Sequence, residues 1–236
     1  MREQSLRGGV GRPAQYVTVY SGMETAPFLD PPVSRQAVRR SLGIADDAQV
    51  VGTIARLFDL KGHDDLLDLA PALCERFERL RFLWVGDGTL RGRFEQRIAA
   101  MGLGDRFILT GLVEPSRIPE LTGAMDILAH PSRREGLARA LAQGALAGKP
   151  VVVYDVDGNR EGLIPGITGV LVPAFEPGRM GEALSALLAD ESARSAMGQA
   201  GRRFALERFD ARVMAEALEQ LYCHAADKRR NHGSRP

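Results

Sequence analysis

Short, uninterrupted apolar runs alternate with longer amphipathic patterns along most of this chain. The runs are rich in Val, Ile, Leu and Phe, and polar residues do not alternate through them. This pattern is typical of parallel strands that are covered on both faces. The sequence therefore predicts six buried strands, at residues 50–54, 82–85, 107–109, 127–129, 151–154 and 169–172.

Helical patterns fill the segments between these runs. The clearest lies at residues 63–77, where apolar side chains form one broad stripe. Strict alternation of strands and helices predicts a parallel sheet with right-handed crossovers. The predicted fold class is therefore α/β, a Rossmann-like doubly wound parallel sheet with extra C-terminal helices. The other predicted helices span residues 90–101, 117–122, 138–147, 181–188, 191–209 and 212–226.

Length, charge and cysteine content exclude several classes of protein. A chain of 236 residues with 44% hydrophobic residues can build one sizeable domain with its own core. The net charge of +1 gives no reason to expect a nucleic-acid partner. Cys74 and Cys223 lack the spacing of a metal site or a disulfide framework. No run is long enough for a transmembrane segment and no signal peptide is evident. We therefore expect a cytoplasmic protein, with peripheral attachment at the inner membrane face left open.

One segment combines an acidic loop, a helix start and a buried strand. Residues 134–150 read Arg-Glu-Gly-Leu-Ala-Arg-Ala-Leu-Ala-Gln-Gly-Ala-Leu-Ala-Gly-Lys-Pro and lead into an apolar run. Glu135 precedes the predicted helix, and Gln143 follows eight positions later. The segment resembles the E-x7-E signature of the retaining GT-B glycosyltransferases of group 1 (family 4-like), with Gln143 in place of the second acid. The resemblance covers residues 16–222, because further motifs follow in the order of that family.

The resemblance implies that Glu135 is the catalytic carboxylate, which binds hydroxyls of the transferred sugar and stabilises positive charge at the anomeric carbon. The donor diphosphate is expected at the first turn of the following helix, where backbone amides are free. Gln143 is expected at the ribose, where it loses the charge-assisted bond of a glutamate. A carboxylate that merely favours the helix dipole is the structural alternative for Glu135. The donor-binding residues implied for this segment are Gly136, Leu137, Ala138, Arg139 and Gln143.

Three further loops match the donor site of the same family. Arg56 and Lys61 follow the first predicted strand at the five-residue offset of the diphosphate-binding pair, although two solvated surface cations are the simpler alternative. A glycine turn follows the second strand, and a third loop resembles the one whose backbone contacts the nucleobase. The donor-binding residues implied for these loops are Gly86, Gly88, Gly111, Leu112 and Val113.

Two motifs point to rival chemistry. Residues 86–88 begin like a dinucleotide fingerprint, but Arg91 replaces its third glycine and the turn is not the first of the sheet. Asp155-Val-Asp157 has the form of the metal-binding D-x-D of the GT-A glycosyltransferases. Its position after a late strand instead matches a glycine-rich loop that ends at Glu161. We therefore expect neither a nicotinamide cofactor nor a metal site.

Two histidines lie beside these motifs. His63 follows Lys61 and Gly62, and we expect it to cap the next helix. His130 ends the fourth predicted strand, close in sequence to Glu135. It either lines the cleft or is a structural histidine with its hydrogen bonds satisfied.

The domain organisation follows from the resemblance. Residues 1–28 resemble the remnant of an N-terminal domain and the segment that crosses between domains, although residues 16–20 also fit the first strand of a one-domain protein. Residues 29–226 are predicted to form the Rossmann-like donor-binding domain with its C-terminal helices. Residues 227–236 are polar and basic, and we expect a disordered tail.

The function implied by the resemblance is hexosyl transfer from a UDP-, GDP- or ADP-sugar to an acceptor hydroxyl with retention of configuration. No cofactor, metal or protein nucleophile is expected, and no nucleic acid partner. The acceptor site is expected on a missing N-terminal domain or a homo-oligomer partner, so an apolar face should be exposed. A non-catalytic nucleotide-sugar binding module and half of a split enzyme are the alternatives. Sugar epimerisation would need acid and base residues that the sequence does not offer.

Overall fold

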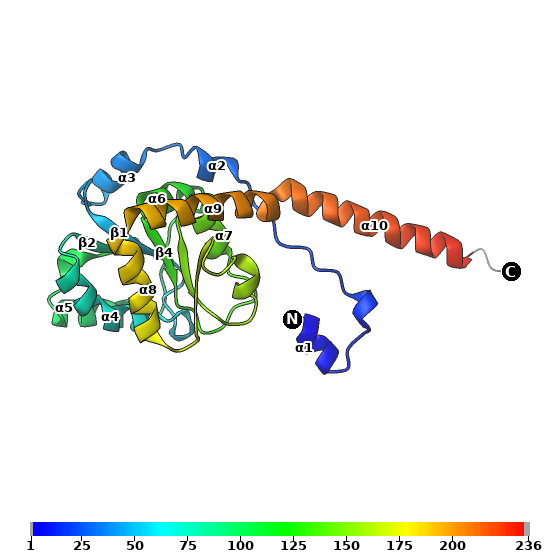
Figure 1. The fold of residues 1–236 in the computed structure, drawn as a ribbon, viewed down its shortest axis with the longest axis horizontal. Helices are drawn as coiled ribbons and strands as arrows, with labels where there is room; N and C mark the ends of the chain where they lie inside the picture. The colour runs from blue at the N-terminus through cyan, green and yellow to red at the C-terminus, as the bar shows by residue number, and fades with distance from the viewer. Residues whose placement is uncertain (1, 234–236) are drawn as a thin grey trace. The chain divides into compact units, whose positions relative to one another are not determined.

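The computed structural model describes residues 2–233 of the chain. These residues form two compact units. One unit consists of residues 26–204, and the other joins the N-terminal 25 residues to the residues from Ala205 onward (Figure 1). The first division lies close to the predicted boundary at residue 28. The end of the chain, in contrast, belongs with the N-terminal residues and not with the sheet.

A six-stranded sheet forms the centre of the unit of residues 26–204. All neighbouring strands are parallel, and the strand order is β3-β2-β1-β4-β5-β6. Every predicted strand is confirmed, with ends that move by at most two residues. The strands are β1 (Gln49–Ile54), β2 (Leu80–Val85), β3 (Phe107–Leu109), β4 (Ile127–His130), β5 (Val151–Tyr154) and β6 (Gly169–Val172).

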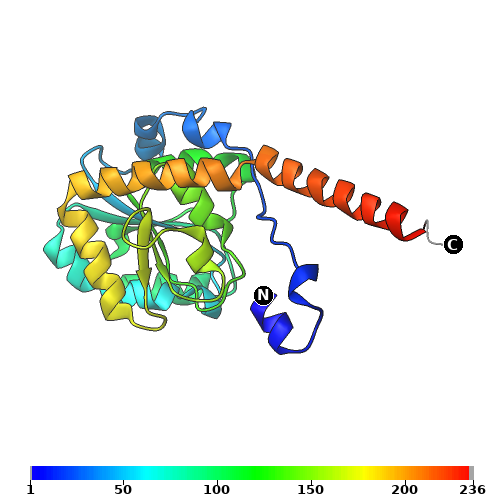
Figure 2. The same ribbon diagram turned by 45° about the vertical axis from the view of Figure 1, so that its right-hand side comes forward.

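Helices cover both faces of this sheet, which explains why its strands are apolar throughout (Figures 1 and 2). Side chains of one face, such as Trp84, pack with helices α4, α5 and α8. Those of the other face, such as Leu83, pack with α3, α6 and α7. The bounds are α2 (Ala26–Leu29), α3 (Arg35–Ser41), α4 (His63–Arg76), α5 (Arg91–Ala100), α6 (Ile118–Ala124), α7 (Arg139–Leu146), α8 (Pro177–Ala189) and α9 (Glu191–Phe209).

Short 3-10 turns complete the described part of the chain. They occur mainly where loops meet strands or helices. Their bounds are η1 (Pro13–Gln15), η2 (Asp59–Lys61), η3 (Gly104–Arg106), η4 (Pro115–Arg117) and η5 (Asn159–Gly162). The turn η2 lies in the loop after β1, and η5 lies in the loop after β5. Both loops take part in the candidate site described below.

The second unit is built from both ends of the chain. It contains α1 (Arg2–Arg7), the end of α9 and α10 (Ala211–Gly233). Residues 16–20 are extended but form no strand; a single bridge joins Met23 to Asp210. The Arg208 guanidinium lies 4.2 Å from the centre of the Tyr20 ring. Helix α10 continues past Ala226, where we expected it to end, because lysine and arginine are good helix formers.

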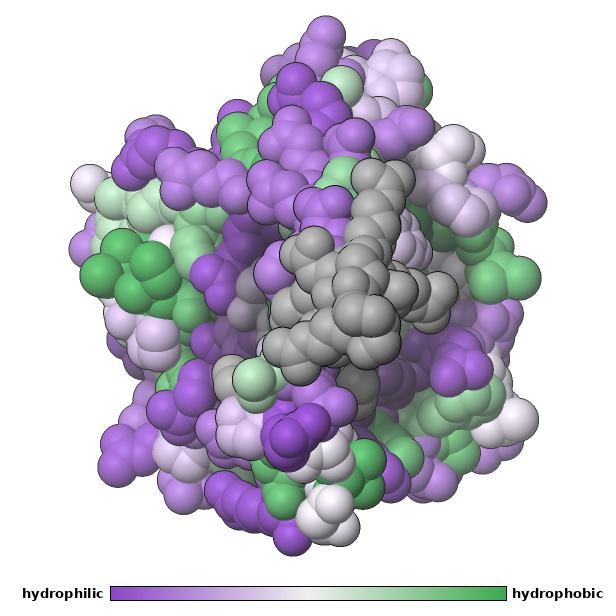
Figure 3. Space-filling view, turned by 90° about the vertical axis from the view of Figure 1, so that its right-hand side faces the viewer, coloured by the Kyte–Doolittle hydropathy of each residue, from purple (hydrophilic) through white to green (hydrophobic). Residues whose placement is uncertain are grey.

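The surface is mainly polar on the face shown in Figure 3, where apolar residues outside the grey atoms form small separate groups. Within residues 2–233, no helix has both the length and the apolar character needed to cross a bilayer. Both cysteines are free thiols; Cys74 is buried and Cys223 is exposed.

Helix α3 was not predicted, and a buried arginine holds it against the sheet. Arg39 is only 1% exposed and forms an ion pair with Asp126, the residue before β4, at 2.9 Å. Arg39 also donates to the carbonyl groups of Ala48 (2.9 Å) and Ala124 (3.0 Å). The other oxygen of Asp126 pairs with Arg35 at 2.7 Å. The α3 segment has few apolar residues, so hydrophobic periodicity could not reveal this anchoring.

This anchoring gives a prediction about stability. In the variant Asp126→Ala, the Arg39 guanidinium stays buried without its carboxylate, so we expect unfolding to cost about 3–5 kcal/mol less than in the wild-type chain. Urea unfolding followed by circular dichroism measures this difference. The control is Asp47→Ala, which breaks an exposed pair with Arg79 and should cost less than about 1 kcal/mol. Equal losses in the two variants would contradict the prediction.

Candidate functional site

The candidate site lies where the strand order reverses. Strands β1 and β4 are neighbours at the centre of the sheet, yet the chain proceeds from β1 toward β2 and β3 on one side and from β4 toward β5 and β6 on the other. The loops that follow β1 and β4 therefore leave the sheet in opposite directions. Such a point opens a crevice at the carboxyl ends of the strands, and ligands of doubly wound folds bind there.

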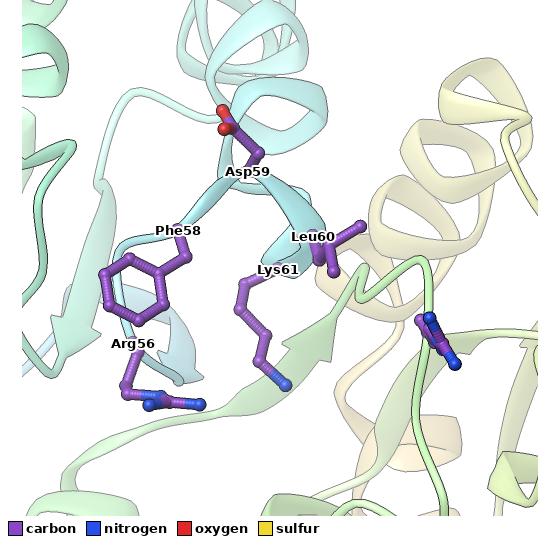
Figure 4. Close-up of a pocket in the computed structure, with 6 residues that line it drawn as sticks. Arg56, Phe58, Asp59, Leu60 and Lys61 are labelled. Carbon is purple, nitrogen blue, oxygen red and sulfur yellow. The ribbon is translucent and has the colours of Figure 1, made fainter.

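The loop after β1 supplies two cations to this crevice. A pocket of about 370 Å³ is lined by Arg56, Phe58, Asp59, Leu60 and Lys61 from this loop and by Arg134 from the loop after β4. The charged ends of Arg56 and Lys61 extend toward the same side, whereas the carboxylate of Asp59 points away from them (Figure 4). The Arg56 guanidinium lies 5.0 Å from the centre of the Phe58 ring. The structure thus brings the two predicted diphosphate-binding residues into one cationic pocket.

Glu135 meets one of these cations across the crevice. Its carboxylate forms an ion pair with Lys61 and lies 3.0 Å from Nε2 of His130. Burial by itself disfavours the charged form of Glu135, but hydrogen bonds from His130, Lys61 and Ser132 outweigh it and lower the pKa of Glu135 to about 2. The carboxylate is therefore ionised at neutral pH. It can accept hydrogen bonds and stabilise a nearby cation, but it holds no proton to donate.

The backbone of Glu135 is held from the loop after β5. The Glu135 amide donates to Oδ2 of Asp157 at 3.0 Å. Asp155, the other carboxylate of the D-x-D, instead accepts from Nε of Arg160 at 3.0 Å. The two carboxylates thus accept hydrogen bonds from different residues. This favours a structural role of the D-x-D motif in the loop over the metal site that its form suggested.

A tightly built glycine turn follows β2. Gly86 has a φ of 140°, and a Cβ on it would lie 2.2 Å from the carbonyl oxygen of Ala55. The Gly86 amide also donates to the carbonyl of Gly111, in the loop after β3, at 3.2 Å. Only glycine fits this contact. A Cβ on Gly88 would likewise lie 2.4 Å from the carbonyl oxygen of Leu57. The two predicted glycines therefore let the loops after β1, β2 and β3 approach one another.

The remaining predicted residues have diverse surroundings. Leu112 is 87% exposed, whereas Gly111 before it is buried and Val113 after it is half-buried. Gly136 is exposed and Leu137 is half-buried in the loop that leads to α7. These residues share a location on loops at the carboxyl edge, and no side-chain chemistry distinguishes them.

Helix α7 begins next to Glu135. Ala138 is the N-cap of α7. The first backbone hydrogen bond at this N-terminal end is donated by the Leu141 amide to the carbonyl of Ala138 at 3.1 Å. The amides of Arg139 and Ala140 therefore have no partner within the helix and are available to an anion. Gln143 is half-buried on the same helix. Gln143 is not among the described residues that bind Glu135.

The expectation that His63 caps the next helix is wrong, because Gly62 is the N-cap of α4 and His63 is its first helical residue. Its ring is 1% exposed and lies 4.8 Å from the ring of Trp84 and 5.6 Å from that of Phe94. Among the described residues, neither ring nitrogen has a hydrogen-bond partner. Burial, together with the nearby His130, lowers the pKa of His63 to about 4. His63 is therefore a neutral core residue below the site. The residues around it are far apart in sequence, so only its position after Gly62 could have drawn attention to it.

Comparison with known proteins identifies the family. The model of the family described as glycosyl transferases group 1 matches residues 34–204. The chain belongs to this family. The structure of Anabaena HepE, solved in complex with UDP, superposes on this chain with a TM-score of 0.84 at 25% identity. The match covers 94% of the present chain and 61% of HepE. The predicted fold class, a Rossmann-like parallel sheet that forms the C-terminal half of a GT-B fold, is therefore confirmed.

The relatives that this chain matches are named as sugar transferases. The alpha-D-kanosaminyltransferase of Streptomyces kanamyceticus is 28% identical over 82% of the present chain and 50% of its own length. The D-inositol 3-phosphate glycosyltransferase of Xylanimonas cellulosilytica is 31% identical over 87% of the present chain and 49% of its own length. The chain therefore spans about half the length of these curated relatives.

A domain-sized solved structure has the same fold. The C-terminal domain of LpcC, a group 1 family protein from Francisella tularensis, superposes with a TM-score of 0.72 at 19% identity. The match covers 80% of the present chain and 100% of that domain. This likeness shows that the chain shares the fold of that C-terminal domain.

The burial of His63 predicts a pH dependence of stability. Because the folded-state pKa of about 4 lies below the ordinary 6.5, the unfolded chain takes up the proton first as the pH falls. The contribution of the neutral, buried His63 to the free energy of unfolding is therefore complete above pH 6.5 and is progressively lost as the pH falls toward 4. We expect His63→Phe to lose about 2–3 kcal/mol less stability than the wild-type chain between pH 7 and pH 4.5.

Urea unfolding at the two pH values gives this difference. The matched control is His224→Phe, at an exposed histidine of α10, which should keep the pH dependence of the wild-type chain. If His63→Phe also kept it, His63 would not be the group that titrates.

Proposed function

We propose that this chain is the donor-binding half of a retaining hexosyltransferase, and that it binds a UDP-, GDP- or ADP-sugar in the crevice between the loops after β1 and β4. The observation that carries the proposal is the placement of Arg56 and Lys61 opposite Glu135 at the point where the strand order reverses. Family membership supports the transferase chemistry. HepE supports the donor class, since it has been solved with UDP and with UDP-glucose.

The cations meet the main electrostatic demand of the reaction. Breaking the bond between the anomeric carbon and the phosphate oxygen leaves its electron pair on the diphosphate. Arg56 and Lys61 would bind this growing negative charge from one side, and the free amides at the start of α7 would bind it from the other. These groups are in place before the donor arrives, so little reorganisation is needed during the reaction.

Glu135 would act on the sugar. An ionised carboxylate accepts hydrogen bonds from two hydroxyls and stabilises the positive charge that develops at the anomeric carbon. Because its pKa is held at about 2, Glu135 is not the acid or base of the reaction at neutral pH. The acceptor hydroxyl would attack from the face that the diphosphate leaves, and its proton would pass to the departing phosphate oxygen. The new glycosidic bond then keeps the original configuration, with no protein nucleophile.

Gln143 would contact the ribose through its neutral amide. An amide accepts a hydrogen bond without the added strength that a carboxylate gives, so we expect weaker nucleotide binding than a glutamate would provide. No cofactor or metal is part of the proposal, since the cationic pocket would supply the positive charge. Chelation with EDTA should then leave donor binding unchanged.

The acceptor side lies outside the part of the fold described here. Exposed apolar side chains occur on three loops at the carboxyl edge of the sheet: Leu60 (55% exposed), Leu112 (87%) and Phe175 (60%). A separate acceptor domain or a second copy of the chain would cover such residues. If neither is supplied, the chain would bind the donor without transferring the sugar, which is the second candidate function.

Calorimetric titration with UDP-, GDP- and ADP-sugars tests the donor site. Loss of a charged hydrogen-bond donor to phosphate in Arg56→Ala should weaken binding about 10- to 100-fold. In Glu135→Ala, the nucleotide sugar should lose its advantage over the nucleoside diphosphate. The control is Arg40→Ala, at an exposed arginine of α3, which should bind like the wild-type chain.

Absence of binding to a folded wild-type chain would overturn the proposal. Equal losses in Arg56→Ala and Arg40→Ala would place the site elsewhere. Binding without transfer in the presence of acceptors would favour the non-catalytic module.

A further inference from the structure

The loop after β5 reaches across to the loop that carries Glu135. Asp157 accepts a hydrogen bond from the Glu135 amide at 3.0 Å. The two residues are 22 positions apart and belong to loops that follow neighbouring strands. This is a contact from a side chain to a backbone group, so it fixes the main chain of Glu135 and leaves its carboxylate free for other partners.

Asp157 makes this contact from an unusual backbone conformation. Its φ is +42°, in the left-handed region that residues with a Cβ rarely adopt. Aspartate tolerates this region better than most residues, but glycine adopts it with no steric cost. If only the path of the backbone mattered, glycine would serve best at this position. The presence of a carboxylate there, bonded to the neighbouring loop, indicates that the side chain has a role of its own.

The loop that presents Asp157 is firmly anchored. Asn159 is fully buried and its Nδ2 donates to the carbonyl of Tyr154 at 3.1 Å. The next residue after Asp157 touches the opposite loop directly, because a Cβ on Gly158 would lie 1.8 Å from the carbonyl oxygen of Gly136. The two loops are thus in backbone contact just beyond the Asp157 hydrogen bond. The Asp157 side chain therefore links the loop after β5 to the loop that carries Glu135.

Glu135 is consequently held from two sides. Lys61 and His130 hold its carboxylate, and Asp157 holds its amide. A carboxylate that must contact particular hydroxyls of a sugar needs both its main chain and its rotamer fixed, because small displacements cost much of the interaction.

We propose that Asp157 is a positioning residue, which holds the Glu135 loop in the geometry that recognises the glycosyl part of the donor. The role in recognition rests on the proposed function. The placement of the loop does not, and it can be measured without any donor.

Two substitutions separate the carboxylate from the backbone conformation. Asp157→Gly relieves the left-handed strain but removes the acceptor. Asp157→Asn keeps an acceptor oxygen and also tolerates the left-handed region. Asp155→Asn is the control in the same loop, since Asp155 bonds to Arg160 and not to Glu135.

Hydrogen exchange of the Glu135 amide, followed by NMR, tests the placement of the loop in the full chain. We expect exchange about tenfold faster in Asp157→Gly, as the loss of one ordinary hydrogen bond would produce, with no fall in melting temperature. Asp157→Asn and Asp155→Asn should exchange like the wild-type chain. Unchanged exchange in Asp157→Gly, or equally fast exchange in Asp157→Asn, would overturn the proposal.

Calorimetry tests the role in recognition. We expect the ratio of the affinity for a UDP-sugar to the affinity for UDP to fall in Asp157→Gly and to be restored in Asp157→Asn. The affinity for UDP itself should be kept in both variants. If the wild-type chain prefers GDP or ADP compounds, these replace the UDP compounds. An unchanged ratio in Asp157→Gly would overturn this role. A wild-type chain that binds no nucleotide sugar would overturn the proposed function instead, and the exchange result would still decide whether Asp157 holds the loop.

Discussion

The ion pair between Lys61 and Glu135 joins the two halves of the sheet where their strand order reverses. Its partners are 74 positions apart in the chain and come from the loops after β1 and β4. They meet because neighbouring parallel strands end at the same edge, and because the two connections then turn away from each other. The remaining features of the site depend on this meeting. Lys61 lines the cationic pocket, and Glu135 lies in the loop that leads into α7.

The ion pair also sets the electrostatic state of the site. Lys61 helps to keep Glu135 ionised although the carboxylate is half-buried, and it is at the same time a cation that an incoming diphosphate would contact. Under the proposed function, Lys61 would thus compensate the charge of Glu135 in the free protein and stabilise the charge of the diphosphate in the reaction. His63, near this pair, is buried and neutral, because burial lowers its pKa to about 4.

Backbone contacts between loops hold the loops of the candidate site in defined positions. At Gly86 and Gly158 the chains of neighbouring loops approach so closely that no side chain fits between them. The loops at the carboxyl edge therefore form a connected layer. The residues of a family motif make specific contacts. The effect of a departure from the motif can therefore be judged only once those contacts are known. Under the proposed function, Gln143 would place a neutral amide at the ribose, whereas Asp157 accepts a hydrogen bond from the Glu135 amide and so holds the loop that carries Glu135.

The sequence by itself determined the sheet and the location of the site. All six strands lie where their apolar runs predicted, because strands buried on both faces need continuous apolar residues. Arg56, Lys61 and Glu135 were predicted from the resemblance to the family's motifs, and they meet because loops after parallel strands share one edge. Only the tertiary structure decided the partners: the polar helix α3 held by Arg39, the neutral His63, and the bond from Asp157 to the Glu135 amide. Those features depend on residues distant in sequence, whose distances and burial exist only after the chain has folded.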